Sequence, residues 1–206
     1  MPKLSIAILA SGRGSNFQSI IDGIEEGEID GKIKVLITNN PNARAIQRAK
    51  EHDIPYEVLS SELYHSREAM DARIKEILDS NKINLVVLAG YMRIIKSKSL
   101  LEQYKHKIIN IHPSLLPAFK GSTDAQKDAY DYGCKISGLT IHFVSDDIDG
   151  GEIILQKAVD ISSCSSGDEV ADKILEYENK SYREVVAMFS KGTFEIKGRH
   201  VKYVPD

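Results

Sequence analysis

The sequence contains no tryptophan and only two cysteines, Cys134 and Cys164, among 206 residues. These cysteines have neither the short spacing of zinc ligands nor a paired framework, so we expect no metal and no disulfide scaffold. A reducing cytoplasm is therefore the expected compartment. Long apolar runs are also missing. The opening run at 4–10 is too brief for a signal peptide, and nothing approaches a membrane span.

An excess of charge of either sign is lacking as well. The chain has 27 basic and 30 acidic residues, a net charge of -3. This balance gives no reason to expect a nucleic-acid or membrane surface, so small molecules are the expected ligands. A chain of 206 residues suits one domain over residues 1–206, and folding should bury roughly 70% of the unfolded surface.

Apolar runs alternate with helical periodicities through the first two thirds of the chain. Strands are expected at 4–10, 33–38, 55–59, 85–88 and 107–111, and helices after the first glycine loop and at 43–51, 67–79, 97–104 and 124–132. Ser66 is the expected N-cap of the third helix, with Ala69, Ile74, Ile77 and Leu78 on its apolar side. The alternation predicts right-handed β-α-β units and a parallel sheet between helices.

The pattern changes after residue 137. Leu139, Ile141 and Phe143, followed by Ile153 and Leu155, predict two antiparallel strands joined through the Asp-rich segment 146–151. A long helix is expected over 167–191, with one side formed by Val170, Ile174, Tyr177, Val185, Met188 and Phe189, and a short hairpin should follow. The predicted fold class is α/β, with a mainly parallel sheet and antiparallel additions in the C-terminal half.

The first glycine loop, Ser11-Gly12-Arg13-Gly14-Ser15-Asn16, lies between a strand and a helix. It begins like a dinucleotide fingerprint, but Phe17 replaces the third glycine, and the second strand ends without the acid that binds a ribose. A P-loop is excluded because no Gly-Lys-Ser/Thr follows. Two interpretations remain open: a site for a single phosphate, or a plain tight turn with Asn16 capping the helix.

A second loop, Gly90-Tyr91-Met92-Arg93-Ile94-Ile95, follows the fourth strand at its carboxyl end, where ligands of open α/β sheets bind. Apolar side chains around Arg93 would suit a flat heterocycle with polar edges. The alternative is a loop that packs into the core while Arg93 extends to solvent.

Asn110 and His112 end the fifth strand, since Pro113 cannot donate to a sheet. Residues two apart in a strand share a face, so an amide and an imidazole would point together, as a developing oxyanion requires. Alone, such a pair more often satisfies backbone groups. Two interpretations of Asp149 remain open. It is either a turn residue required by the backbone geometry of the hairpin, or a carboxylate that orients His112 and raises its pKa. His142 is expected to be a packed core histidine.

Four parts of the sequence together closely resemble the phosphoribosylglycinamide formyltransferase family. They are Ser11-Gly12-Arg13-Gly14-Ser15-Asn16, Gly90-Tyr91-Met92-Arg93-Ile94, Asn110-Ile111-His112-Pro113-Ser114-Leu115-Leu116-Pro117, and His142-Phe143-Val144 with Asp149-Gly150-Gly151. The resemblance covers nearly the whole chain and implies a Rossmann-like formyltransferase fold. It implies formyl transfer from 10-formyltetrahydrofolate to glycinamide ribonucleotide in purine biosynthesis, without a metal, and is compatible with a homodimer.

The resemblance also implies roles for individual residues. The catalytic residues would be Asn110, His112 and Asp149. The ribonucleotide would be held by Gly14, Ser15, Asn16 and Glu178, and the folate by Arg67, Met92, Arg93, Ile94, Ile95 and Asn110.

Two departures accompany the resemblance. Ser122-Thr123-Asp124 stands where some members have a histidine, and Gly151-Glu152 where many have Gly-Pro. The same catalytic trio occurs in methionyl-tRNA formyltransferase, amino-sugar formyltransferases and formyltetrahydrofolate hydrolase. The first normally has a C-terminal tRNA-binding extension and the last an N-terminal regulatory domain, and neither is expected here. A non-catalytic binder of a nucleotide or folate is the alternative from another class.

Overall fold

The computed structural model describes residues 3–64 and 66–206, so the first two residues of the expected 1–206 domain lie outside the described part. The strands are β1 (Leu4–Leu9), β2 (Gly31–Thr38), β3 (Tyr56–Val58), β4 (Leu85–Leu88), β5 (Ile108–His112), β6 (Ile136–Phe143), β7 (Ile153–Asp160), β8 (Gly192–Lys197) and β9 (His200–Pro205). The helices are α1 (Ser15–Glu25), α2 (Arg44–Glu51), α3 (Arg67–Ser80), α4 (Lys98–Gln103), α5 (Ala125–Tyr132) and α6 (Gly167–Lys191).

Seven strands form one sheet in the order β3-β2-β1-β4-β5-β6-β7. The first five pair in parallel, while β6 and β7 add antiparallel pairs and β8 and β9 form a separate hairpin. The predicted fold class and terminal hairpin are confirmed. Strand order reverses between β1 and β4, and this switch point is where α/β sheets bind ligands.

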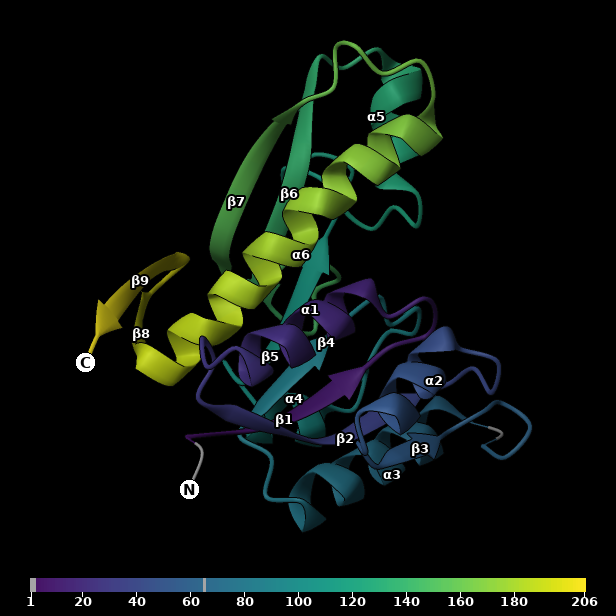
Figure 1. Cartoon of the computed structure of the whole chain (residues 1–206), viewed down its shortest axis with the longest axis vertical. Helices are drawn as coiled ribbons and strands as arrows, with labels where there is room; N and C mark the ends of the chain where they lie inside the picture. Colours follow the sequence, from purple (N-terminus) through teal and green to yellow (C-terminus); the bar gives the residue numbers. More distant parts are fainter. Residues whose placement is uncertain (1–2, 65) are drawn as a thin grey trace.

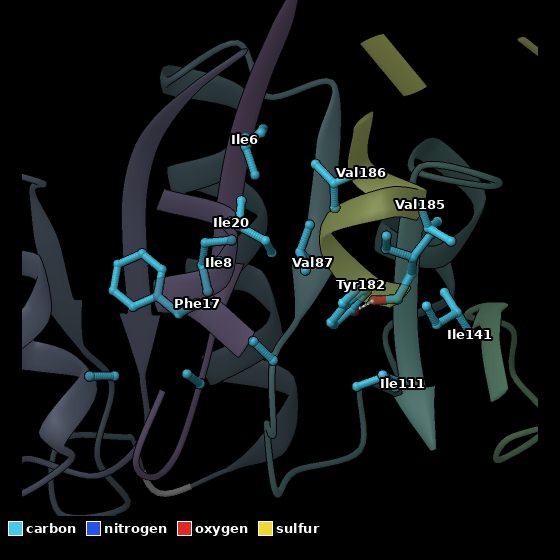
Figure 2. Packing of buried hydrophobic residues seen from close by; sticks show 14 of the residues in the cluster. Ile6, Ile8, Phe17, Ile20, Val87, Ile111, Ile141, Tyr182, Val185 and Val186 are labelled. Carbon is cyan, nitrogen blue, oxygen red and sulfur yellow. Dashed lines mark hydrogen bonds between the residues drawn. The ribbon is translucent and has the colours of Figure 1, made fainter. Parts of the chain in front are cut away.

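Helices cover both faces of the parallel part (Figure 1). Along β1, Ile6 and Ile8 join one core cluster and Ala7 and Leu9 the other, as the two-residue period of a strand requires. The first cluster holds side chains of α1 and α6. In Figure 2, Val87 lies between them, with Phe17 and Ile20 of α1 on one side and Tyr182 of α6 on the other. The second cluster holds α3 and α4.

Two details of the helices differ from the predicted pattern. On α3, Ala69 is exposed and Met70 takes its place in the core, although Ser66 does cap the helix by accepting from the Ala69 N–H. On α6 the wholly buried face includes Tyr182 and Val186, whereas Tyr177, Met188 and Phe189 are only partly buried.

The hydroxyl of Tyr182 is the reason that a tyrosine can occupy the core. It lies 2.9 Å from the carbonyl oxygen of Leu88 and 3.0 Å from that of Ile109. A buried hydroxyl needs such a partner. Tyr182 therefore ties α6 to the ends of β4 and β5. Within residues 3–64 and 66–206, no helix combines the length and apolar character needed to span a membrane.

Candidate active site

A cavity of about 610 Å³ opens where β1, β4 and β5 end, between the segment 144–149 and α6. The cavity is lined by all but one of the predicted site residues: Gly14, Ser15, Asn16, Met92, Arg93, Ile94, Ile95, Asn110, His112, Asp149 and Glu178. The exception is Arg67, which is exposed at the start of α3 and does not contribute to the lining.

The glycine loop forms the end of the cavity next to α1. Gly14 is the N-cap of α1 in a left-handed conformation, with φ 71°, and makes no side-chain cap. A Cβ atom on Gly14 would lie 3.0 Å from the Cβ atom of Ala45, so both conformation and space call for glycine. Asn16 is not the helix cap, contrary to the plain-turn interpretation. The first N–H groups of α1 are therefore left to bind an anion.

Asn16 and Glu178 form a buried polar pair beside this loop. The side-chain nitrogen of Asn16 donates to Glu178 Oε2 over 3.2 Å, and Asn16 Oδ1 is buried without a hydrogen bond from the described residues. Burial raises the pKa of Glu178, although the Asn16 amide and the Arg13 charge oppose the rise. The pair thus places the carboxyl group of Glu178 in the cavity lining, next to a buried amide oxygen without a partner among the described residues.

The loop after β4 has an apolar outer edge. The side chains of Met92 and Ile94 are 66% and 42% exposed, whereas Ile95 is buried. At the far end of the loop, Asp71 of α3 accepts the N–H groups of Lys96 and Ser97, both over 2.8 Å. The loop is therefore anchored, yet it offers apolar surface to a ligand.

His112 and Asp149 meet beside the cavity. His112 Nδ1 lies 3.3 Å from Asp149 Oδ2, and these side chains are 6% and 13% exposed. The other ring nitrogen, Nε2, donates to the carbonyl oxygen of Phe119 over 3.0 Å. Asp149 has a φ of 48°, and it also accepts the N–H of Gly121 over 3.0 Å. Asp149 therefore has the backbone conformation of a turn residue and also lies within reach of His112.

Opposing effects set the pKa values of His112 and Asp149. Burial lowers the pKa of His112 and outweighs the opposing effects of Asp149 and the Phe119 carbonyl. Asp149 does raise this pKa, as expected, but burial sets the net direction. Burial also acts to raise the pKa of Asp149, but His142, His112 and the Gly121 N–H together hold it below its usual value.

His142 is a packed histidine, as expected, with 2% of its surface exposed. It is also part of the cavity lining, where sequence reasoning assigned it no role. Nδ1 donates to the Phe143 carbonyl over 2.8 Å, so the neutral ring can accept at Nε2, which lies 3.2 Å from the Asn110 amide nitrogen. Nε2 is also 3.7 Å from Asp149 Oδ1. Asn110 and His142 are direct partners in the β5–β6 pairing, and aligning these two strands could have revealed the contact.

Comparisons with known proteins agree on one family. The sequence model of a family described as "Formyl transferase" matches residues 4–186. A phosphoribosylglycinamide formyltransferase of Bacillus subtilis (strain 168) is 39% identical over 180 residues, which cover 87% of this chain and 91% of that protein. The human trifunctional purine biosynthetic protein adenosine-3 is 35% identical over 194 residues, which are 94% of this chain but only 19% of that protein's length.

A solved structure extends the similarity to three dimensions. Glycinamide ribonucleotide transformylase 1 from Symbiobacterium toebii is similar with a TM-score of 0.93 and 38% sequence identity. The match covers 98% of this chain and 94% of the chain in that crystal structure.

Proposed function

Because this chain belongs to the formyl transferase family, we propose that it transfers the formyl group of 10-formyltetrahydrofolate to the amine of 5-phosphoribosylglycinamide. The products are formylglycinamide ribonucleotide and tetrahydrofolate, and the reaction belongs to purine biosynthesis. The observation that supports this best is the convergence of Asn110, His112 and Asp149 on one cavity, between the glycine loop and the loop after β4.

The ribonucleotide binds at the glycine loop in this proposal. The N–H groups of Gly14, Ser15 and Asn16 at the start of α1 hold the phosphate. The side-chain oxygen of Asn16 cannot do so, because it is an acceptor and a phosphate dianion has no proton to donate. Asn16 Oδ1 and Glu178 instead accept N–H or O–H groups from the rest of the ribonucleotide.

The folate binds along the loop after β4. Met92 and Ile94 supply apolar surface, and Asn110 lines the same cavity. Arg67 lies outside the cavity lining, so it can contribute only where a long ligand extends beyond the cavity. The anionic glutamate end of a folate has both the length and the charge for such a contact.

The reaction begins when the amine attacks the formyl carbon. The carbonyl π electrons move to oxygen, and the resulting oxyanion is stabilised by Asn110 and His112. His112 must first exchange its hydrogen bond to the Phe119 carbonyl for one to the substrate. The new negative charge favours the imidazolium form that burial disfavours.

Asp149 supports that charge and orients the ring. A proton then passes from the attacking amine, through water near Asp149, to the departing folate nitrogen, and the C–N bond to the folate breaks. Holding both substrates in line supplies much of the remaining acceleration.

An absorbance assay with purified protein, glycinamide ribonucleotide and 10-formyltetrahydrofolate tests the proposal. We expect turnover that requires both substrates. Release of formate when the ribonucleotide is omitted would instead identify a hydrolase, and binding without turnover would identify a non-catalytic binder.

A further inference from the structure

Ser11 lies between the two loops to which the proposed function assigns the substrates. It follows β1 and directly precedes Gly12, is 8% exposed, and lines the cavity. The sequence motifs give no role to its side chain.

Two hydrogen bonds join Ser11 to the loop after β4. Its N–H donates to the Gly90 carbonyl over 3.0 Å, and its hydroxyl oxygen accepts the Met92 N–H over 2.8 Å. Because the Met92 side chain is 66% exposed, packing around that side chain does little to fix the start of the loop. The Ser11 hydroxyl is therefore a principal anchor at this end, as Asp71 is at the other.

The remaining polar groups of Ser11 are also engaged. A backbone N–H can only donate, so the hydroxyl must accept from Met92 and direct its own proton to Asn39 Oδ1. The Ser11 carbonyl accepts from the Asn40 side chain over 3.1 Å. Ser11 thus joins the loop after β4 to the glycine loop through both its backbone and its hydroxyl.

From this arrangement we infer that Ser11 is a positioning residue that couples the two substrate subsites. A ligand that orders the glycine loop also orders the Met92 end of the folate loop, so the second ligand loses less conformational entropy on binding. The inference rests on the proposed function for the identity of the two ligands. It adds a thermodynamic coupling that a pair of independent subsites would not have.

The test measures binding without chemistry. Tetrahydrofolate carries no formyl group, so its affinity can be titrated calorimetrically with and without saturating glycinamide ribonucleotide. For the wild type we expect the ribonucleotide to tighten binding by about fivefold or more, within the usual range of such couplings. In Ser11→Ala the Met92 N–H loses its acceptor, and the coupling should fall below about twofold.

Ser190→Ala is the matched control. Ser190 is 6% exposed, accepts the Asp30 N–H, donates to the Ala187 carbonyl, and lies outside the cavity lining. Its removal should leave the coupling unchanged. Asn39→Ala provides a second probe of the link, because it removes the acceptor of the Ser11 proton at a half-buried position. The coupling should fall in this variant too.

The inference is overturned if the wild type shows no coupling, if both Ser11→Ala and Asn39→Ala retain it, or if Ser190→Ala abolishes it equally. Failure of the proposed function is seen separately, as absence of wild-type turnover with 10-formyltetrahydrofolate, because the titrations do not depend on turnover.

Discussion

Replacing Asp149 with asparagine tests whether a carboxylate supports the charge on His112. Asparagine keeps the shape of the side chain and tolerates the left-handed backbone at this position, where φ is 48°. The substitution therefore removes the negative charge while it leaves the turn in place.

The 3.3 Å separation between His112 Nδ1 and Asp149 Oδ2 sets the magnitude. Two unit charges at this distance attract by about 5 kcal/mol at an effective dielectric constant of about 20. Even if solvent and rearrangement remove half of this energy, about 2.5 kcal/mol of support for the imidazolium is lost. The expected loss in kcat is then about 70-fold or greater.

The pH profile provides the sharper measurement. Burial already lowers the pKa of His112, and Asp149 opposes that effect, so Asp149→Asn should lower the pKa further. Because the reaction uses the imidazolium form, kcat/KM falls as pH rises through the pKa of His112 in the free enzyme, and that decline should move to lower pH in the variant. Stopped assays across the pH range, with thermal melts to verify folding, measure both quantities. A kcat within about threefold of the wild type, or a profile that does not move, would refute the reasoning.

Three further predictions concern Asn110, Glu178 and Tyr182. Asn110→Ala should lower kcat by on the order of 100-fold, as loss of an oxyanion donor does, and the proposed role is wrong if initial rates at saturation remain near those of the wild type. Because burial raises the pKa of Glu178, its contribution favours folding at low pH and is lost as pH rises from the ordinary value through the raised one. Glu178→Gln should therefore melt at or above the wild-type temperature at neutral pH while KM for the ribonucleotide rises; a lower melting temperature there would contradict the pKa argument. Tyr182→Phe should cost about 1 kcal/mol in urea denaturation, because it removes the hydroxyl from the Leu88 and Ile109 carbonyls, and an unchanged midpoint would show that these contacts contribute nothing.

The order of strands and helices could be predicted from the sequence because most elements show either the apolar runs of buried strands or the 3.6-residue period of a helix. β4 and α6 have the predicted bounds, and the other elements differ at their ends by a few residues. The prediction that Ala69 lies on the apolar side of α3 is wrong. Tertiary packing selects the buried side of this helix, and the longer Met70 fills the space in the core. Tyr182 was not among the residues expected on the buried side of α6, because its burial depends on the β4 and β5 carbonyls that its hydroxyl meets.

The site residues likewise fall into those that the sequence indicated and those that it did not. Three separate short motifs marked Gly14, Met92 and Asn110, and the resemblance added Glu178 from a distant helix. The hydroxyl bonds of Ser11 and the ring contacts of His142 could not be predicted with equal ease, because both depend on which backbone lies opposite them. The net pKa of His112 likewise depends on burial, which no neighbouring residue in the sequence reveals.

The facing positions of Asn110 and His142 on β5 and β6 also constrain evolution. A change of Asn110 to an apolar residue would leave Nε2 of His142, in a side chain that is 2% exposed, without its hydrogen-bond partner, at a cost of about 1–3 kcal/mol. Such a substitution is thus selected against twice, once through the chemistry and once through stability. Among relatives, these two positions should therefore either both be retained or be exchanged together, even though 32 residues separate them along the chain.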